Sequence, residues 1–183
     1  SLMKNQMIQN KKLIIFSIVV AVVVLWQMLL PGYVLTLDMV FGPHVAFPSL
    51  SSMTTSSYPV WIVLYGLNFV MSAWVVQKII LLVLFFLLFY MPARFYLFAV
   101  AEDKNSEYAA YFVALLYAIN PFVYERLLAG NWLVLAGYAV LPAFIYSLTS
   151  FYREHAWRNA MMVPVWLLLI GLFSQHMLVM GVL

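Results

Sequence analysis

Long apolar runs separated by short polar segments dominate this chain. An apolar run of about 20 residues can cross the hydrocarbon core of a bilayer as a helix. None of the runs shows the two-residue alternation of a membrane β-barrel. The pattern therefore predicts an all-α integral membrane protein with about five transmembrane helices. These are Leu13–Leu30, Ile79–Val100, Tyr108–Ile119, Trp132–Leu148 and Met161–Leu183.

One further segment, Pro59–Gln77, is apolar but carries a mildly polar stripe at helical spacing. The stripe consists of Trp61, Tyr65, Asn68 and Ser72. We expect a helix that lies at the outer membrane interface or packs inside the protein. The long segment before it, from Pro31 to about Tyr58, is apolar at both ends and holds aromatic residues, so we expect a loop that lies on the membrane surface. Loops of this length are commonly functional or disordered.

The basic residues indicate an orientation for these helices. If Pro59–Gln77 does not cross, seven basic residues share the N-terminal side, and only Lys78 and Arg126 lie opposite. The seven are Lys4, Lys11, Lys12, Arg94, Lys104, Arg153 and Arg158. If the segment crosses, the split is five against four. Cytoplasmic loops carry the excess of Lys and Arg. The sequence thus predicts a plasma-membrane protein with a cytoplasmic N-terminus, and places the loops of Asp38 and Arg126 on the outer face.

Composition supports the membrane interpretation. Hydrophobic residues make up 67% of the chain and charged residues 8%, whereas soluble domains carry about 25% charged residues. The absence of cysteine excludes disulfides and thiolate metal sites. The net charge of +3 is scattered, which argues against a nucleic-acid partner. We expect residues 1–183 to form a single transmembrane module. Because Leu183 lies within an apolar run, we expect this module to be the N-terminal fragment of a larger protein.

Six ionisable residues gather on the predicted outer face, where such groups tend to be functional or paired. They are Asp38, His44, Lys78, Glu125, Arg126 and His176. Asp38 has apolar neighbours on both sides, so partial desolvation would suit it to act as a general base on a hydroxyl. The alternative, that Asp38 caps a short helix or pairs with a lysine, is favoured by composition alone.

The other members of this group suggest anion or metal binding. Lys78 and Arg126 could hold an anionic head group such as a phosphate, although Lys78 alone is better explained as a residue that snorkels at a helix end. Glu125 need not neutralise Arg126, because neighbours in sequence point in different directions on a helix. A divalent cation could bind Asp38, His44 and His176. No short metal-ligand spacing is present, so structural histidines are favoured and no cofactor is firmly predicted.

Several motifs together resemble a known family. They are the lone Asp38 in the first outer loop, the pair Gln77-Lys78 leading a span, the stretch Tyr117-Ala118-Ile119-Asn120-Pro121-Phe122-Val123-Tyr124-Glu125-Arg126, and Gly130-Asn131-Trp132. In this order they resemble the N-terminal part of polytopic GT-C glycosyltransferases, especially the arabinofuranosyltransferase-like branch. The resemblance covers nearly the whole chain, but only the first part of such an enzyme. It departs from many members in having one Asp where they carry an acidic pair.

The resemblance implies a function on the outer membrane face. Such enzymes move a sugar from a polyprenyl-phosphate-linked donor to a hydroxyl of a glycan or lipid acceptor, with inversion. Asp38 would be the base, Lys78 and Arg126 would hold the donor phosphate, and the fragment alone would be inactive. The alternative is a non-catalytic membrane subunit, or a fragment of a transporter or flippase. Transporters place polar groups near the membrane midplane, whereas charges here sit mostly at predicted helix ends.

Overall fold

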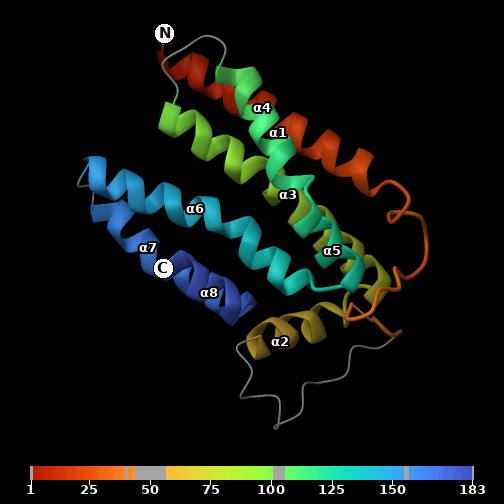
Figure 1. The fold of residues 1–183 in the computed structure, drawn as a ribbon. Coiled ribbons are helices and arrows are strands. Elements are labelled where there is room, and N and C mark those ends of the chain that lie inside the picture. The colour runs from red at the N-terminus through yellow and green to blue at the C-terminus, as the bar shows by residue number, and fades with distance from the viewer. Residues whose placement is uncertain (1, 40, 44–56, 101–105, 155–156, 183) are drawn as a thin grey trace.

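The computed structural model describes residues 2–39, 41–43, 57–100, 106–154 and 157–182, and regular structure in these ranges is entirely helical. Figure 1 shows the arrangement. The helices are α1 (Leu2–Leu25), α2 (Tyr58–Leu67), α3 (Ala73–Val100), α4 (Ser106–Ala118), α5 (Pro121–Ala129), α6 (Trp132–Glu154), α7 (Trp157–Phe173) and α8 (Gln175–Val182).

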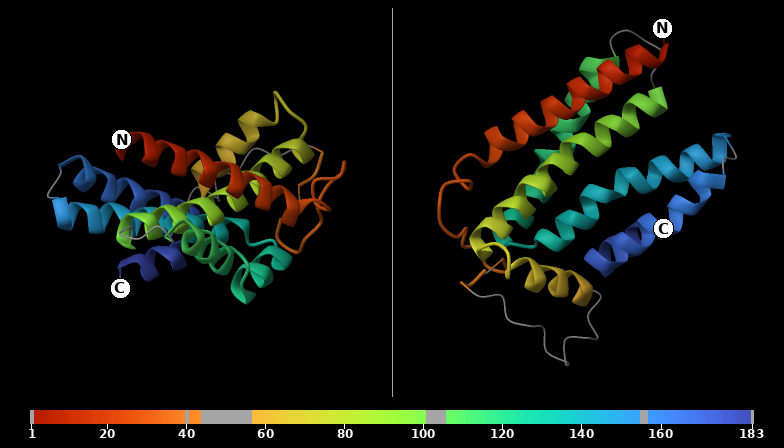
Figure 2. Two further views of the ribbon diagram at one scale, coloured as in Figure 1. Left: turned by 90° about the horizontal axis from the view of Figure 1, so that it is seen from above. Right: turned by 180° about the vertical axis from the view of Figure 1, so that it is seen from behind.

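Helix α3 is the centre of the bundle. It packs against α1, α4 and α6, and α6 in turn packs against α7. The views in Figure 2 agree that α1, α3 and α4 form one group, with α6 and α7 beside it. Phe85, Leu88 and Phe89 of α3 are among the largest side chains buried in the core. Helix α4 presents a buried stripe of small side chains to this core, made up of Ala110, Ala114 and Ala118. Lipid provides no hydrophobic driving force for helix association, so membrane helices are held together largely by close packing, which small residues allow.

Two helices, α3 and α6, are long and apolar enough to cross a membrane. Helices α4 and α5 meet the same criterion only as a pair, bent by 44° at the break between them. Because every described element is helical and these spans are strongly apolar, the structure fits an all-α membrane protein. The prediction of about five spans is wrong, since the described residues provide two, or three if the bent pair counts as one.

The first and last predicted spans have other boundaries in the structure. Helix α1 ends at Leu25 rather than Leu30, where a turn follows with the Met28 amide donating to the Leu25 carbonyl at 2.8 Å. The predicted span Met161–Leu183 breaks at Ser174. Helix α8 then doubles back on α7, as Figure 1 shows, so that Gly171 lies against Leu178 and Gly181 against Leu167. The last apolar run is therefore a helical hairpin and not one long helix.

Three other boundaries differ from the prediction. The segment Pro59–Gln77 divides into α2, which lies across one end of the bundle, and the start of α3 at Ala73. The segment between the predicted spans Tyr108–Ile119 and Trp132–Leu148 contains α5, and α6 continues past Leu148 to Glu154. Residues 44–56 lie outside the described residues, and they include His44 and most of the Ser-rich and Thr-rich segment from Ser49 to Ser57.

Candidate functional site

The loop that carries Asp38 is fixed against the end of α5. The Asp38 backbone amide donates to the Ala129 carbonyl at 2.8 Å. The next residue, Gly130, ends α5 in the left-handed conformation with φ of +79°, which glycine adopts without strain. A Cβ atom on Gly130 would lie 2.4 Å from both the Met39 amide nitrogen and the Thr36 hydroxyl oxygen. Glycine is therefore needed for the loop to approach this closely.

A buried glutamine holds the same loop from the other side. Gln77 of α3 is fully buried, and its Oε1 accepts from the Val34 amide at 2.9 Å. Its Nε2 donates to the Val34 carbonyl at 2.7 Å and to the Met39 carbonyl at 3.4 Å. One side chain thus satisfies three backbone groups, each of which would be costly to leave unpaired in an apolar interior. Asp38 lies between these anchored residues, so its position is set by α3 and α5 together.

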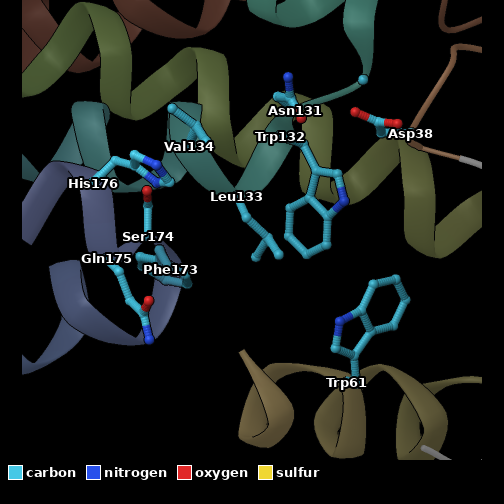
Figure 3. Close-up of a pocket in the computed structure, with 11 residues that line it drawn as sticks. Asp38, Trp61, Asn131, Trp132, Leu133, Val134, Phe173, Ser174, Gln175 and His176 are labelled. Carbon is cyan, nitrogen blue, oxygen red and sulfur yellow. The ribbon is translucent and has the colours of Figure 1, made fainter. Parts of the chain in front are cut away.

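The anchored loop forms part of a cavity of about 430 Å³. Its lining comes from the Asp38 loop, α2, the start of α6 and the turn between α7 and α8. Figure 3 shows the arrangement, with Asp38 and His176 on opposite sides, Asn131 between them, and Trp61 on the side of α2. The lining residues are Asp38, Trp61, Gly130, Asn131, Trp132, Leu133, Val134, Phe173, Ser174, Gln175 and His176.

The cavity combines hydrogen-bonding groups with flat apolar faces. Trp61 and Trp132 meet edge to face, with ring centroids 6.2 Å apart. Asp38 and His176 are exposed, and the Asp38 carboxylate has no hydrogen bond or ion pair with another described residue. The protein itself therefore leaves the Asp38 side chain accessible. A free carboxylate, an imidazole, two amides and two indoles suit a ligand that is polar at its edges and apolar on its faces.

No protein-family model, curated protein or solved structure matches this chain. The interpretation of the site therefore depends on its geometry.

Lys78 is occupied elsewhere. It is 7% exposed, and its ammonium group donates to the backbone carbonyls of Met28, at 2.7 Å, and Leu30. It also lies over the ring of Trp74, 5.9 Å from the centroid. The carbonyls after the last turn of α1 need such donors because no backbone amide reaches them. Lys78 does not line the cavity, so the structure supports a capping role in place of the predicted phosphate contact.

Arg126 and Glu125 lie on α5, one turn before the cavity lining begins at Gly130. The Arg126 guanidinium lies over the ring of Phe122, 5.6 Å from its centroid, and its buried Nε has no hydrogen-bond partner. Within the described ranges it makes no ion pair. Glu125 is exposed. Neither residue lines the cavity, but Arg126 has both unused charge and an unused donor next to it.

The metal hypothesis receives no support from the parts of the chain that the structure describes. In these ranges no three His, Asp or Glu side chains are grouped closely enough to hold a metal ion. Asp38 and His176 do line the same cavity. The third residue of the hypothesis, His44, lies outside the described residues.

Several lining residues were not predicted as site residues. The sequence indicates Trp61 only as part of a polar stripe and Trp132 only within a motif, yet both line the cavity. The sequence indicates Asn131 only within that motif, and it places Ser174 and Gln175 inside the predicted span Met161–Leu183. A signal did exist at Gly130-Asn131, because a glycine followed by a polar residue after an apolar segment is typical of a helix end. The turn at Ser174 has no comparable signal.

Proposed function

We propose that this chain is the sugar-handling membrane module of a glycosyltransferase that uses a polyprenyl-phosphate-linked donor. The observation that carries the proposal is the free Asp38 carboxylate at a cavity lined by two indoles and by polar side chains. A sugar ring has hydroxyl groups around its edge and an apolar face, so it fits such a lining. The resemblance of the motifs to GT-C enzymes points in the same direction.

In the proposed reaction, Asp38 removes the proton from the acceptor hydroxyl as its oxygen attacks the anomeric carbon. The new oxygen–carbon bond forms while the bond from that carbon to the donor phosphate breaks, and the electron pair leaves with the polyprenyl phosphate. Attack opposite to the leaving group inverts the anomeric carbon. Arg126 is the cation proposed to face the leaving phosphate, because a guanidinium without a carboxylate partner can stabilise developing negative charge. On this proposal the cavity opens at the outer face of the plasma membrane.

Photo-crosslinking tests the binding part of the proposal. The chain is reconstituted into liposomes with a diazirine-labelled polyprenyl-phosphate analogue, and the crosslinked peptides are identified. We expect labelling around residues 36–39 and 126–134, competed by an unlabelled polyprenyl-phosphate sugar. Labelling spread over the lipid-facing helices and insensitive to the competitor would contradict the proposal.

An Asp38→Asn variant tests the catalytic part in the full product of the gene. We expect sugar transfer to fall about 10² to 10⁴-fold, the usual contribution of a general base, while crosslinking stays at the level of the unmodified protein. A Glu107→Gln control removes a carboxylate that pairs with Lys12 and does not line the cavity, and should leave transfer unchanged. Unchanged transfer in Asp38→Asn would rule out Asp38 as the base.

The broken helices favour one other candidate, a fragment of a transporter or flippase. Interrupted helices whose ends face a central site are common in transporters, and here the α7–α8 break at Ser174 lines the cavity. A lipid-scrambling assay with a fluorescent polyprenyl-phosphate lipid separates the two. Lipid movement without any sugar transfer would favour the transporter, and the converse would favour the enzyme.

A further inference from the structure

A second cavity, of about 440 Å³, lies between α3, α6 and α7. It is lined by Tyr90, Met91, Arg94, Phe95, Ala143, Tyr146, Ser147, Met162 and Trp166. None of these residues lines the first cavity. Trp132 lines the first cavity and Ser147 the second, and at the rise of an α-helix they are separated along α6 by about 20 Å. That distance is a large part of the roughly 30 Å thickness of the hydrocarbon core. If α6 crosses the membrane, the two cavities lie at different depths in it.

Arg94 gives this second cavity a positive charge. Its Nη1 donates to Asn10 Oδ1 at 3.2 Å, and in the described ranges no carboxylate lies within ion-pair distance of it. The side chain is exposed. A second cation, Arg153, lies nearby over the ring of Phe98, which in turn contacts Tyr146 of the cavity wall. The charge at this cavity therefore lacks a protein counter-ion and would be complemented by an anion.

The remaining wall is apolar in character. The Trp166 indole N–H donates to the Ser147 hydroxyl at 2.9 Å, so these two polar groups satisfy each other. The rings of Tyr146 and Phe98 meet edge to face, with their centroids 4.5 Å apart. The Met162 side chain is 39% exposed. A small soluble anion would gain nothing from such a wall, whereas an acyl chain would bury apolar surface against it.

Each of the three helices carries a proline at this level. Pro92 lies between Met91 and Arg94 on α3, Pro142 precedes Ala143 on α6, and Pro164 lies between Met162 and Trp166 on α7. A proline inside a helix removes one backbone hydrogen bond and crowds the preceding turn, which bends the helix. Each of the three helices that line the cavity thus lacks one backbone hydrogen bond at this level.

We propose that this second cavity binds an anionic phospholipid, with the lipid phosphate on Arg94 and the start of one acyl chain against Tyr146, Met162 and Trp166. Basic pockets between membrane helices are suited to anionic head groups. The proposal is independent of the sugar-transfer hypothesis, because it concerns different residues at a different depth.

The test measures which lipids stay bound. The full 183-residue chain is purified from bilayers that contain equal amounts of phosphatidylglycerol and phosphatidylcholine, and retained lipid is quantified by native mass spectrometry. We expect preferential retention of phosphatidylglycerol. Arg94→Gln should reduce it about tenfold, because a charge-assisted hydrogen bond is lost. Lys11→Gln is the control, since this exposed lysine carries the same charge but does not line the cavity, and we expect less than a threefold change.

Two further measurements make the result decisive. Ala143→Leu fills the cavity without changing charge, and we expect it to lower phosphatidylglycerol retention while an unchanged melting temperature shows that the fold persists. If Ala143→Leu melts early, the Arg94→Gln comparison alone decides. Inorganic phosphate is added as a competitor to separate the two sources of phosphate. Equal retention in Arg94→Gln and the unmodified chain, or full displacement by millimolar phosphate, would overturn the proposal.

Discussion

Gly130 determines how closely the loop carrying Asp38 approaches α5. We expect Gly130→Ala to destabilise the protein by about 2 to 4 kcal/mol, because a left-handed backbone strains alanine and the new Cβ would overlap Met39 and Thr36. Thermal unfolding in detergent measures the effect. Gly66→Ala is the control, since a Cβ at Gly66 in α2 meets no atom within 4 Å and alanine favours a helix by up to about 1 kcal/mol. Equal melting temperatures for the two variants would refute this account of the loop.

Gln77 acts on the same loop through hydrogen bonds. Replacing it with leucine keeps the approximate size but leaves the amide and carbonyl of Val34 without partners, at a cost of about 1 to 3 kcal/mol for each buried group. We expect Gln77→Leu to release the loop and to speed proteolysis near residues 31–43. Gln27→Leu makes the same chemical change at an exposed position and should leave the cleavage pattern alone. If both variants are cleaved at the same rate, Gln77 does not hold the loop.

At the scale of elements, the sequence predicts a helix correctly where the apolar or periodic pattern is strong. The helical character of α3, α4 and α6 was expected, because their apolar runs end at polar segments. Helix α5 was missed although its signals were present. Asn120 accepts from the Val123 amide as an N-cap, Pro121 occupies the first turn and Gly130 ends the helix. Such an Asn-Pro start and glycine end mark a helix, but the charged residues Glu125 and Arg126 interrupt the apolar pattern that predicts a span.

The α7–α8 hairpin could not be predicted from the local sequence. Its turn at Ser174 lies within a continuous apolar run, and only contacts with α6 show why the chain reverses. A Cβ on Gly137 of α6 would lie 3.1 Å from the Met177 Cβ, so the small residue leaves room for α8 to return. The Ser174 hydroxyl accepts from the Met177 amide at 3.4 Å, which helps to start α8. Such tertiary packing outweighs local pattern.

A cysteine pair tests this reversal directly, and the chain has no native cysteine to interfere. With Leu167→Cys and Gly181→Cys in one chain, we expect efficient intramolecular crosslinking by a short bis-maleimide, because Leu167 lies beside Gly181. In one uninterrupted helix these positions would be about 21 Å apart. Each single-cysteine variant serves as the control for intermolecular products. Failure of the pair to crosslink in folded protein would restore the single continuous span.

At the scale of the whole molecule, one hydrogen bond constrains the number of crossings. Asp38 and Ala129 are joined by their backbones, so they lie on the same side of any membrane the chain crosses. Of the helices between them, α3 alone is long enough to cross singly, and α2 has only 10 residues. If α3 crosses, the chain must return before Ala129, and the bent pair α4–α5 is the element that meets the requirement. This hydrogen bond therefore favours two crossings between Asp38 and Ala129, made by α3 and by the bent pair α4–α5.

Cysteine labelling in intact cells tests that topology. Leu37→Cys lies beside the first cavity and Tyr108→Cys lies at the start of α4, and both positions are largely exposed, at 82% and 76%. With α3 as the single crossing between them, a membrane-impermeant maleimide should label one position in intact cells and reach the other only after permeabilisation. The excess of basic residues at the Tyr108 end predicts that Leu37 is the outer position. Labelling of both positions in intact cells would exclude a crossing by α3. Labelling of Tyr108 alone would invert the orientation and remove the first cavity from the outer face that the proposed sugar transfer requires.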